Sequence, residues 1–329
     1  MHAAYIEELG TPDVIRYGEL PPPLPGPTDV LIDVLATTVN PVDTFVRSGA
    51  FRTPVAFPFV IGRDLVGRVS ALSVSGCGAP GFAAGDLVWS NSLGHGGRQG
   101  AAAEQAVVAA DRLYHLPADA DPYEAVAVVH PAATAYLALF THGRMRAGET
   151  VLVAGAAGNV GSALVVMAVR AGARVVATAG ARDAAYCRSL GASEVLDYRD
   201  PGLFEHIRAV TPRGVDVYLD TAGENDLTHA VGLMARRGRI VLLAGARSRP
   251  VLPAGPLYMK DCSVVGFVIS HATAAELAEA AVTVNSFLGG ARLRPRAAET
   301  LPLSSAAETH RRMEAGRLHG RRVVLRPDH

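Results

Sequence analysis

The sequence predicts an α/β protein that combines a doubly wound, six-stranded parallel sheet with a second, β-rich unit. In the middle third of the chain, apolar runs rich in Val, Leu and Ile alternate with helix-length segments, and buried parallel strands have such continuous hydrophobic sequences. The composition agrees, because 49% hydrophobic residues with 34 Gly and 21 Pro are typical of many short elements joined by turns. The six expected strands span residues 150–156, 174–180, 193–198, 215–223, 238–246 and 263–270.

The length of 329 residues favours two domains, each with a core of its own. Residues 1–122 contain short β-like runs separated by Gly and Pro turns, as in a barrel-like unit. Residues 271–329 contain a helix-like segment and a final strand-like run, "RRVVLR", which the six-stranded sheet does not need. We therefore expect a first domain at 1–122, a nucleotide-binding domain at 123–270, and a return to the first domain at 271–329.

Charge and cysteine content exclude several classes of protein. Lys plus Arg (31) equals Asp plus Glu (31), so no overall positive field attracts nucleic acid or an anionic membrane. Cys77, Cys187 and Cys262 are too widely spaced for a disulfide framework or a CxxC metal lobe. The N-terminus has no basic region followed by an apolar run. We expect a cytoplasmic protein that neither enters a membrane nor binds nucleic acid.

The stretch "VLVAGAAGNVGS" carries the most specific local signal. Gly155, Gly158 and Gly161 follow an expected strand and begin an expected helix that ends near Gly172. Such glycines allow a tight turn, a close approach of the backbone to a pyrophosphate, and close packing of helix on strand. The helix N-terminus then offers unpaired N–H groups to the phosphates. The turn predicts a dinucleotide site that also includes Ala156, Asn159 and Val160, with Asn at 159 tolerating a positive φ.

The end of the second strand favours NADP(H) over NAD(H). An NAD site usually has an acidic residue there for the ribose hydroxyls, whereas this strand end places Thr178, Gly180 and Arg182 in "VVATAGARDAAY". A guanidinium can bind a 2′-phosphate with two hydrogen bonds. Asp183 weakens this inference, and Arg182 could instead be a solvated residue at a helix start.

Taken together, these residues resemble the medium-chain dehydrogenase/reductase superfamily, in particular its zinc-free quinone oxidoreductase branch, which includes ζ-crystallin-like proteins. The likeness covers nearly the whole chain, with "TTVNPVDTFVRSG", "AAGNVG", "GASEVLDYRD", "VDVYLDTAG" and "GRRVVLRP" as its most specific parts. The resemblance implies a GroES-like catalytic domain that is split in sequence around a Rossmann domain, with the active site in the cleft between them.

The resemblance also assigns further cofactor contacts. It places Tyr198 near the adenosine phosphate, although this residue could equally pack at a strand end. It places Phe267 and Val268 where backbone groups hold the nicotinamide carboxamide, and Thr134 near the nicotinamide, with packing as the alternative role. We include Ala222 and Gly245 in the expected cofactor-binding set.

The same comparison argues against zinc. Zinc-dependent relatives bind a catalytic metal through a Cys and a His-Glu pair, where this chain has Asn40 in "VNPVD" and Arg63 in "IGRDLVG". Arg cannot ligate zinc, and no cysteine cluster offers a structural site. Without a Lewis acid, hydride addition to a quinone or an α,β-unsaturated carbonyl is the expected reaction, because such acceptors spread the incoming charge onto their own oxygen.

Five residues are candidates for the chemistry, each with an ordinary structural alternative. Asn40 corresponds to a family position that faces nicotinamide and substrate, or it fixes the turn before Pro41. Asp43 could act in catalysis or hydrogen-bond the backbone of its own loop. Phe45 stands where relatives commonly have Tyr, which leaves the proton donor open. His95 and His130, the latter at the expected start of a helix, could each supply an acid near neutral pH or serve as a loop or cap histidine.

Alternative functions remain open. The first is an enoyl-thioester or polyketide-intermediate reductase of specialised metabolism, which the atypical "SNSLGHGGRQG" loop and the missing tyrosine favour. The second is a nucleotide-bound protein without catalysis, with a structural or RNA-binding role, although no basic or aromatic stripe supports RNA binding. The likeness also suggests a homodimer, because the apolar sixth strand, "SVVGFVIS", could pair with its copy across a two-fold axis.

Overall fold

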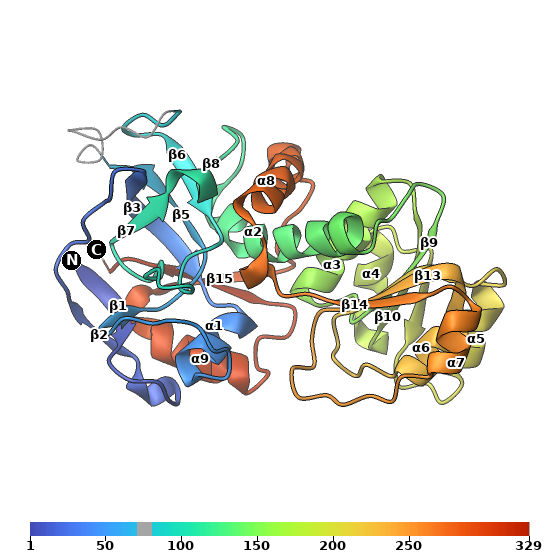
Figure 1. Cartoon of the computed structure of the whole chain (residues 1–329). Helices are drawn as coiled ribbons and strands as arrows, with labels where there is room; N and C mark the ends of the chain where they lie inside the picture. Colours follow the sequence, from blue (N-terminus) through green and yellow to red (C-terminus); the bar gives the residue numbers. More distant parts are fainter. Residues whose placement is uncertain (71–80, 329) are drawn as a thin grey trace. The chain divides into compact units, whose positions relative to one another are not determined.

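The computed structural model describes residues 1–70 and 81–328 and divides the chain into two compact units (Figure 1). One unit comprises Met1–His130 with Leu277–His329, and the other comprises Pro131–Glu276. The divisions fall inside two long helices, α2 and α8, a few residues beyond the boundaries expected from the sequence. Cys77 lies outside the described residues.

The second unit is built on a parallel sheet with the strand order β11-β10-β9-β12-β13-β14. This is the order of a dinucleotide-binding fold, in which the chain starts at the centre and reverses direction once. The predicted Rossmann fold is thereby confirmed. The strands are β9 (Thr150–Ala154), β10 (Arg174–Ala179), β11 (Glu194–Asp197), β12 (Val215–Asp220), β13 (Met234–Leu242) and β14 (Ser263–Gly266).

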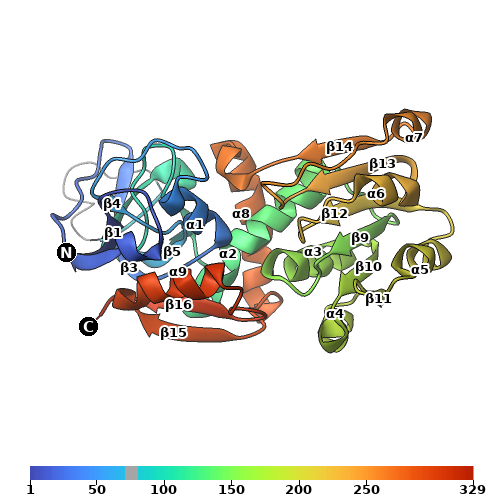
Figure 2. The ribbon, with the colours of Figure 1, turned by 90° about the horizontal axis from the view of Figure 1, so that it is seen from below.

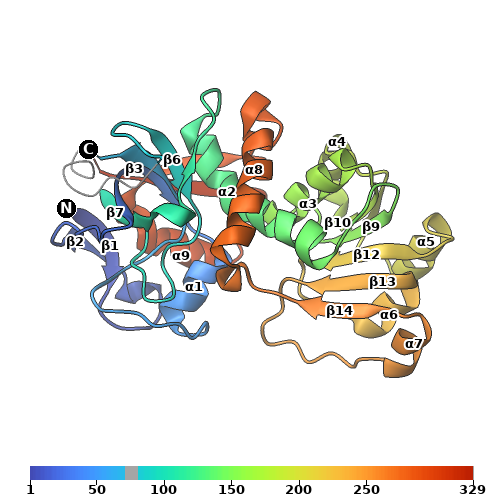
Figure 3. The same cartoon turned by 45° about the horizontal axis from the view of Figure 1, so that its top comes forward.

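Helices cover both faces of this sheet (Figure 3). Right-handed crossovers place α3 and α4 on one face, and α5, α6 and α7 on the other. On the second face, Ile207 and Val231 pack against Leu152 of β9 and Ile240 of β13. The helices are α3 (Asn159–Arg170), α4 (Ala184–Ser189), α5 (Leu203–Val210), α6 (Leu227–Leu233) and α7 (Ala254–Met259).

The first unit is β-rich, as predicted for a GroES-like domain. Its sheets have the orders β2-β1-β4 and β15-β16-β3-β5-β6-β8, and β7 also pairs with β3. The strands are β1 (His2–Ile6), β2 (Arg16–Glu19), β3 (Asp29–Thr38), β4 (Phe59–Val60), β5 (Leu65–Val69), β6 (Leu87–Ser90), β7 (Gln105–Ala109), β8 (Tyr114–His115), β15 (Ala298–Pro302) and β16 (Arg322–Arg326).

Segments from both ends of the sequence share the core of this unit, and Figure 2 shows β15, β16 and α9 beside β3. Strand β16 pairs antiparallel with β3, and the buried side chains of Ile6, Val46 and Leu325 belong to one hydrophobic cluster. The helices here are α1 (Pro41–Ser48) and α9 (Ala306–Glu314), while α2 (Pro122–Tyr136) and α8 (Ala274–Leu288) contain the divisions between the units.

Helix α2 continues as a π-helical turn to His142, and the combined segment is apolar. The segment Pro122–His142 is long and apolar enough to cross a membrane, but 72% of its most apolar window is buried inside the protein. A buried helix of this kind is typical of a protein core. Of the cysteines in the described part, Cys187 is buried and Cys262 is half-buried.

Candidate functional site

A tight turn joins β9 to α3 and has the geometry that phosphate binding requires. Gly155 has a φ of +77°, and a Cβ on Gly161 would lie 2.2 Å from the carbonyl oxygen of Gly155. Only glycine therefore lets the helix approach the strand so closely. The first intrahelical hydrogen bond runs from the N–H of Ser162 to Gly158, which leaves the N–H groups of residues 159–161 pointing beyond the helix start.

One predicted residue of this turn differs in detail from the expectation. Asn159 is the first residue of α3 and is not among the residues with positive φ, so its tolerance of that conformation is not needed. The N–H of Ala156 donates to the Thr178 carbonyl, and Thr178 itself is buried. Val160 is half-buried on the first turn of the helix.

Asp220 organises the loop that follows β12. Its buried carboxylate accepts the backbone N–H groups of Ala222 and Gly223, at 2.9 and 2.8 Å, and that of Asn225 at 2.8 Å. Gly245 packs directly against this loop, because a Cβ there would lie 2.6 Å from the Gly223 carbonyl oxygen. Ala222 and Gly245 thus shape a rigid loop, and the N–H of Ala222 is already used within the protein.

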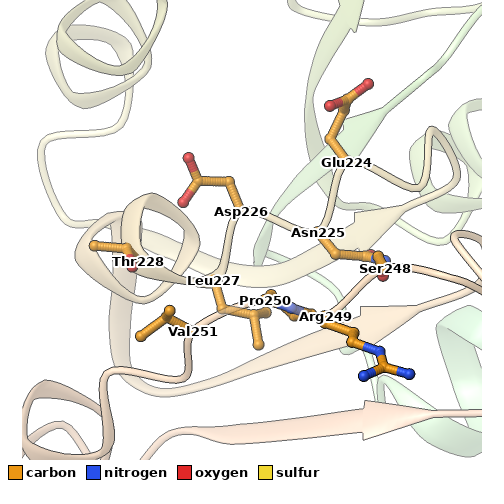
Figure 4. Close-up of a pocket in the computed structure, with 9 residues that line it drawn as sticks. All are labelled: Glu224, Asn225, Asp226, Leu227, Thr228, Ser248, Arg249, Pro250 and Val251. Carbon is orange, nitrogen blue, oxygen red and sulfur yellow. The ribbon is translucent and has the colours of Figure 1, made fainter.

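An open pocket of about 440 Å³ lies beside this loop (Figure 4). The Asn225 side chain donates a 2.6 Å hydrogen bond to the Ser248 hydroxyl within it. None of the predicted cofactor residues lines this pocket, which is formed by Glu224, Asn225, Asp226, Leu227, Thr228, Ser248, Arg249, Pro250 and Val251.

Two arginines gather at the adjoining tips of β10 and β11. The Arg182 side chain is 72% exposed, and the Arg199 guanidinium lies 5.3 Å from the centre of the exposed Tyr198 ring. A Cβ on Gly180 would lie 3.2 Å from Arg199 and 3.7 Å from Tyr198, so Gly180 leaves room between them. This corner combines two exposed cations with an aromatic ring.

Carboxylates are also present at this corner. Asp197 pairs with the Arg199 guanidinium at 3.2 Å, and hydrogen bonds from Arg199 lower the pKa of Asp197 below its ordinary value. Asp183 is 2% exposed and lies 3.7 Å from the Arg182 Nε. The acids are therefore held by the protein or turned inward, while the arginine side chains extend into solvent.

Phe267 and Val268, two of the remaining predicted cofactor residues, directly follow β14, and the third, Thr134, lies on α2. Phe267 stacks on His142, with ring centres 4.3 Å apart, and burial lowers the pKa of His142 although Glu276 opposes it. Val268 is 40% exposed, so an apolar side chain faces solvent directly after the strand. Thr134 lies half-buried on α2.

In the β-rich unit, α1 begins at a cap formed by two candidate residues. The backbone N–H of Asn40 donates to the Asp43 carboxylate at 2.7 Å, Pro41 occupies the first helical position, and Gly49 closes the helix with a φ of +76°. Burial raises the pKa of Asp43 to about 6, against the lowering influence of Arg63. Phe45 is 43% exposed on the same helix.

The Asn40 side chain lies in a buried polar network. Its Nδ2 donates to Asp64 Oδ2 at 2.7 Å, and its Oδ1 accepts a 3.0 Å hydrogen bond from Arg322 of β16. Arg322 is 2% exposed and also donates to the Thr38 hydroxyl and the Val39 carbonyl. The C-terminal strand thereby fixes the amide that the resemblance places toward nicotinamide and substrate.

His130 lies inside α2 and not at a helix start, so that part of the sequence prediction was wrong. Pro131 within the helix lacks an N–H, which would otherwise donate to the Ala127 carbonyl. Arg322 Nε donates to that carbonyl at 2.8 Å, and this bond lets the helix continue through the proline. His130 Nδ1 lies 3.3 Å from the buried Asp64 Oδ1.

His95 lies in its Gly-rich loop with both ring nitrogens engaged. Nδ1 is 3.1 Å from the Leu93 carbonyl, and Nε2 is 2.9 Å from an Arg98 guanidinium nitrogen. Because a carbonyl only accepts and a guanidinium only donates, the proton must be on Nδ1. This arrangement, in a residue 5% exposed, favours the role of an anchor for the loop.

Asn40 and Arg63, where the sequence resemblance places ligands of zinc-dependent relatives, are both buried. Arg63 is 1% exposed, and Asn40 and Asp64 bind each other. Among residues 1–70 and 81–328, no group of three or more His, Cys, Asp or Glu side chains is arranged to hold a metal ion.

Sequence reasoning missed Asp64, Arg199 and Arg322 as members of these clusters. An acidic residue directly before an apolar strand, as in "RDLVGRV", is a signal for a buried carboxylate that needs partners. Arg199 follows Tyr198 directly in the quoted "LDYRD" motif. Nothing in the sequence around Arg322 indicates that it reaches Asn40.

Comparison with known proteins agrees with these two units. Residues 26–118 match the alcohol dehydrogenase GroES-like domain, and residues 159–284 match the zinc-binding dehydrogenase family. Human quinone oxidoreductase is 30% identical over 313 residues, covering 94% of this chain and 93% of that protein. The chain belongs to the medium-chain dehydrogenase/reductase superfamily, in its quinone oxidoreductase branch. The resemblance inferred from the sequence is thereby confirmed.

Solved structures of this superfamily extend the likeness. A mycobacterial quinone oxidoreductase superimposes with a TM-score of 0.85 at 30% identity, covering 99% of this chain and 100% of that one. Quinone oxidoreductase of Escherichia coli in complex with NADPH gives 0.84 at 26% identity over 99% and 100%. A structure described as an NAD-dependent alcohol dehydrogenase gives 0.88 at 30% identity over the whole of both chains. By homology, the protein is an oxidoreductase of the quinone oxidoreductase branch.

Proposed function

We propose that the protein uses NADPH to reduce a quinone or an α,β-unsaturated carbonyl compound. The observation that carries the choice of cofactor is the pair Arg182 and Arg199 beside Tyr198, at the strand tips where a 2′-phosphate would lie. Two guanidinium groups match a phosphate dianion in charge and geometry. A mycobacterial relative and the Escherichia coli relative are described as complexes with NADPH, which supports the same choice.

The residues present fit such a dinucleotide. The glycines at 155 and 161 bring α3 against β9, and the N–H groups of residues 159–161 form the positive end of the helix for a pyrophosphate. Arg182, Tyr198 and Arg199 would hold the 2′-phosphate. Backbone groups at Phe267 and Val268 would face the carboxamide. When bound, NADPH supplies a hydride, and the chain supplies orientation and hydrogen-bond donors.

The chemistry of the residues in the β-rich unit supports a conjugated acceptor. The resemblance places a thiolate and an imidazole of zinc relatives where this chain has Asn40 and Arg63. A guanidinium does not ligate zinc, and the Asn40 carbonyl oxygen already accepts a hydrogen bond from Arg322. We therefore propose a reaction without zinc. A quinone or enone accepts hydride with little help, because the charge moves onto its own oxygen.

A second candidate is reduction of an enoyl thioester. Phe45 supports it, because this large apolar side chain is 43% exposed on α1 at a position where the resemblance predicts a tyrosine, and an acyl chain would find an apolar contact there.

The test is oxidation of NADPH by purified protein with 1,4-naphthoquinone, a cyclic enone and an enoyl thioester as acceptors. We expect saturable NADPH binding and turnover with the quinone or the enone. Turnover with the thioester alone would establish the second candidate. Binding of NADPH without oxidation by any acceptor would indicate a nucleotide-binding protein without catalysis. Stoichiometric zinc in elemental analysis would contradict the zinc-free mechanism.

We further propose that the protein forms a homodimer through β14. This strand is the outermost of the six-stranded sheet, and the nearby Tyr258, Met259 and Val268 are 69%, 72% and 40% exposed. An apolar strand edge with exposed apolar neighbours is suited to pairing with a second copy. Light scattering coupled to size-exclusion chromatography should give about twice the chain mass of 34.3 kDa, and a monomer mass at micromolar concentration would contradict the dimer.

A further inference from the structure

Asp64 is a carboxylate buried in the β-rich unit, and its two oxygens have different surroundings. Oδ2 accepts hydrogen bonds from Asn40 Nδ2 at 2.7 Å and from the Thr38 hydroxyl at 3.2 Å. Oδ1 accepts no hydrogen bond from the described residues, and it lies 3.3 Å from His130 Nδ1 without the alignment of a hydrogen bond. The oxygen that faces the imidazole is therefore the one with capacity for a further partner.

Arg322 fixes both members of this pair. It holds Asn40 Oδ1 and the Thr38 hydroxyl, the two side chains that bind Asp64. It also holds the Ala127 carbonyl, which lies one helical turn before His130 on α2. The guanidinium is buried, and these three contacts, with a fourth to the Val39 carbonyl, lie within 3.2 Å. The carboxylate and the imidazole are thus held in a fixed relation by a single cation.

The charges around the pair are balanced. Asp43 on α1 and Asp64 face Arg63 and Arg322, so two buried acids accompany two buried guanidinium groups. The imidazole of His130 is the fifth member of the cluster, with Nδ1 3.3 Å from Asp64 Oδ1. His130 retains 7% exposure, whereas Asp64 has none, so the imidazole is the member that can exchange a proton beyond the core.

We propose that Asp64 positions His130 as the proton donor of the reduction, with Asn40, Thr38 and Arg322 fixing the carboxylate. This inference rests on the proposed function. Reduction of an enone adds a hydride to the β-carbon, with its electron pair, and a proton to the α-carbon, while NADPH leaves as NADP⁺. His130 loses that proton and regains one from water. Asp64 keeps its charge throughout and aligns Nδ1, as an apo contact can tighten when the imidazole becomes charged.

The test compares His130→Asn and Asp64→Asn with the wild type, and Thr37→Val serves as the matched control. Thr37 donates a 2.6 Å hydrogen bond to the backbone carbonyl of Asp64, so its loss perturbs the same segment without removing the carboxylate. The acceptors are 1,4-naphthoquinone and 2-methylcyclohex-2-enone. The second acceptor gives a product whose α-carbon becomes chiral when it receives the proton. NADPH binding and thermal unfolding are measured for every variant.

We expect His130→Asn to lower kcat by about 100-fold, the size of a general-acid contribution, and to abolish the enantiomeric excess at the α-carbon. Asp64→Asn should move the alkaline limb of the kcat profile to lower pH, because the imidazolium loses its carboxylate. Asp43, Arg63 and Arg322 remain in both variants, but the pKa of Asp43 also responds to Asp64 and His130, so the limb is interpreted together with the enantiomeric excess. Thr37→Val should change the unfolding temperature but neither the pH profile of kcat nor the enantiomeric excess.

Two outcomes would overturn the proposal, and they differ from failure of the proposed function. A wild-type enzyme that gives racemic product would show that solvent supplies the proton. Folded His130→Asn and Asp64→Asn enzymes that retain the wild-type pH profile would show that the pair is structural. Failure of the wild type to oxidise NADPH with either acceptor would instead remove the proposed function and this inference with it.

Discussion

Arg239 and Glu149 form a two-pronged ion pair at the start of the central strands. The Arg239 Nη1 and Nη2 atoms lie 3.0 and 2.7 Å from the two Glu149 oxygens, and Nε donates to the Gly143 carbonyl at 2.7 Å. The two side chains are only 11% and 20% exposed. This ion pair joins β13 to the segment that leads into β9. Its two parallel hydrogen bonds make it stronger than an ordinary surface ion pair.

Loss of this pair should destabilise the nucleotide-binding unit. Glu149→Gln should lower the free energy of unfolding by about 2 kcal/mol, the value of hydrogen bonds to a charged group. Burial raises the pKa of Glu149, but hydrogen bonds from Arg239 and the Arg146 backbone lower it below 4.5 overall. The stabilisation is therefore present above pH 4.5 and is lost as the pH falls through the lowered value. Urea unfolding of the wild type and Glu149→Gln at pH 7 and pH 3 measures this stabilisation. If the substitution lowered the free energy of unfolding equally at both pH values, the stabilisation would not come from the ionised carboxylate.

Arg182 and Arg199 should determine the preference for NADPH. Arg182→Ala and Arg199→Ala should each raise the Kd of NADPH by roughly 10- to 100-fold, the equivalent of one charge-assisted contact, and leave NADH binding nearly unchanged. Fluorescence titration with both nucleotides measures the ratio. Arg188→Ala removes an exposed arginine of α4 and serves as the control. A similar rise in the Kd of NADPH for this variant would show that the effect comes from net charge and not from specific contacts.

Gly158 and Gly161 should respond differently to alanine. A Cβ on Gly161 would lie 2.2 Å from a backbone oxygen, so Gly161→Ala should unfold the turn and lower the melting temperature. A Cβ on Gly158 would lie 3.3 Å from the Gly155 carbonyl oxygen, and this residue has a negative φ. Gly158→Ala should therefore fold and still bind NADPH weakly, because the methyl group faces the pyrophosphate. Calorimetry and titration separate the two effects, and undiminished NADPH binding by Gly158→Ala would argue against a phosphate at this turn.

Lys260 should stabilise the end of α6. Its Nζ donates three hydrogen bonds of 3.0 Å to the carbonyls of Val231, Gly232 and Met234, where a helix C-terminus is negative. Lys260→Met should cost about 2 kcal/mol of unfolding free energy. Arg213→Met, which removes an exposed cation from the same unit, should change stability little. Equal effects of the two substitutions would rule out the specific contacts.

His310 should make the β-rich unit sensitive to acid. Burial, together with the charge of Arg47, lowers the pKa of His310 from 6.5 to about 3, and neither ring nitrogen has a hydrogen-bond partner among the described residues. The unfolded chain therefore binds a proton below pH 6.5 that the folded chain refuses down to about pH 3. Stability should fall across this window by at most about 1.4 kcal/mol per pH unit.

Unfolding of His310→Gln at several pH values checks this prediction. The substitution should flatten the pH dependence, and His319→Gln, which changes an exposed histidine, should preserve it. If the free energy of unfolding of His310→Gln varied with pH as it does in the wild type, other groups would be responsible for the acid sensitivity.

Much of the six-stranded unit could be predicted because its strands are buried on both faces. A strand such as 150–156 is a continuous apolar run, and the structure places β9 at its start. In the other unit, β1 and β2 were not anticipated. They are only five and four residues long, and buried and exposed positions do not alternate along either strand. Their sequences therefore lack a clear period, and pairing with β4 and with each other defines them.

The candidate site was predictable only where local sequence determines geometry. The turn at Gly155 and the cap at Asn40 depend on neighbouring residues and could be predicted. The surroundings of Asp64 depend on partners from β3, α2 and β16, which no local pattern contains. The expectation of a helix start at His130 was wrong because a distant arginine supplies the hydrogen bond that Pro131 omits, and the helix continues through the proline.

The hydrogen bond between Arg322 and Asn40 joins residues 282 positions apart. A ribosome must therefore synthesise the whole nucleotide-binding unit before the guanidinium that completes the buried cluster exists. During translation, the N-terminal part of the β-rich unit, Met1–His130, is complete while Asp64 and Asn40 still lack the Arg322 guanidinium. A nascent chain arrested before residue 322 is accordingly expected to remain dependent on chaperones, whatever the state of its parallel sheet.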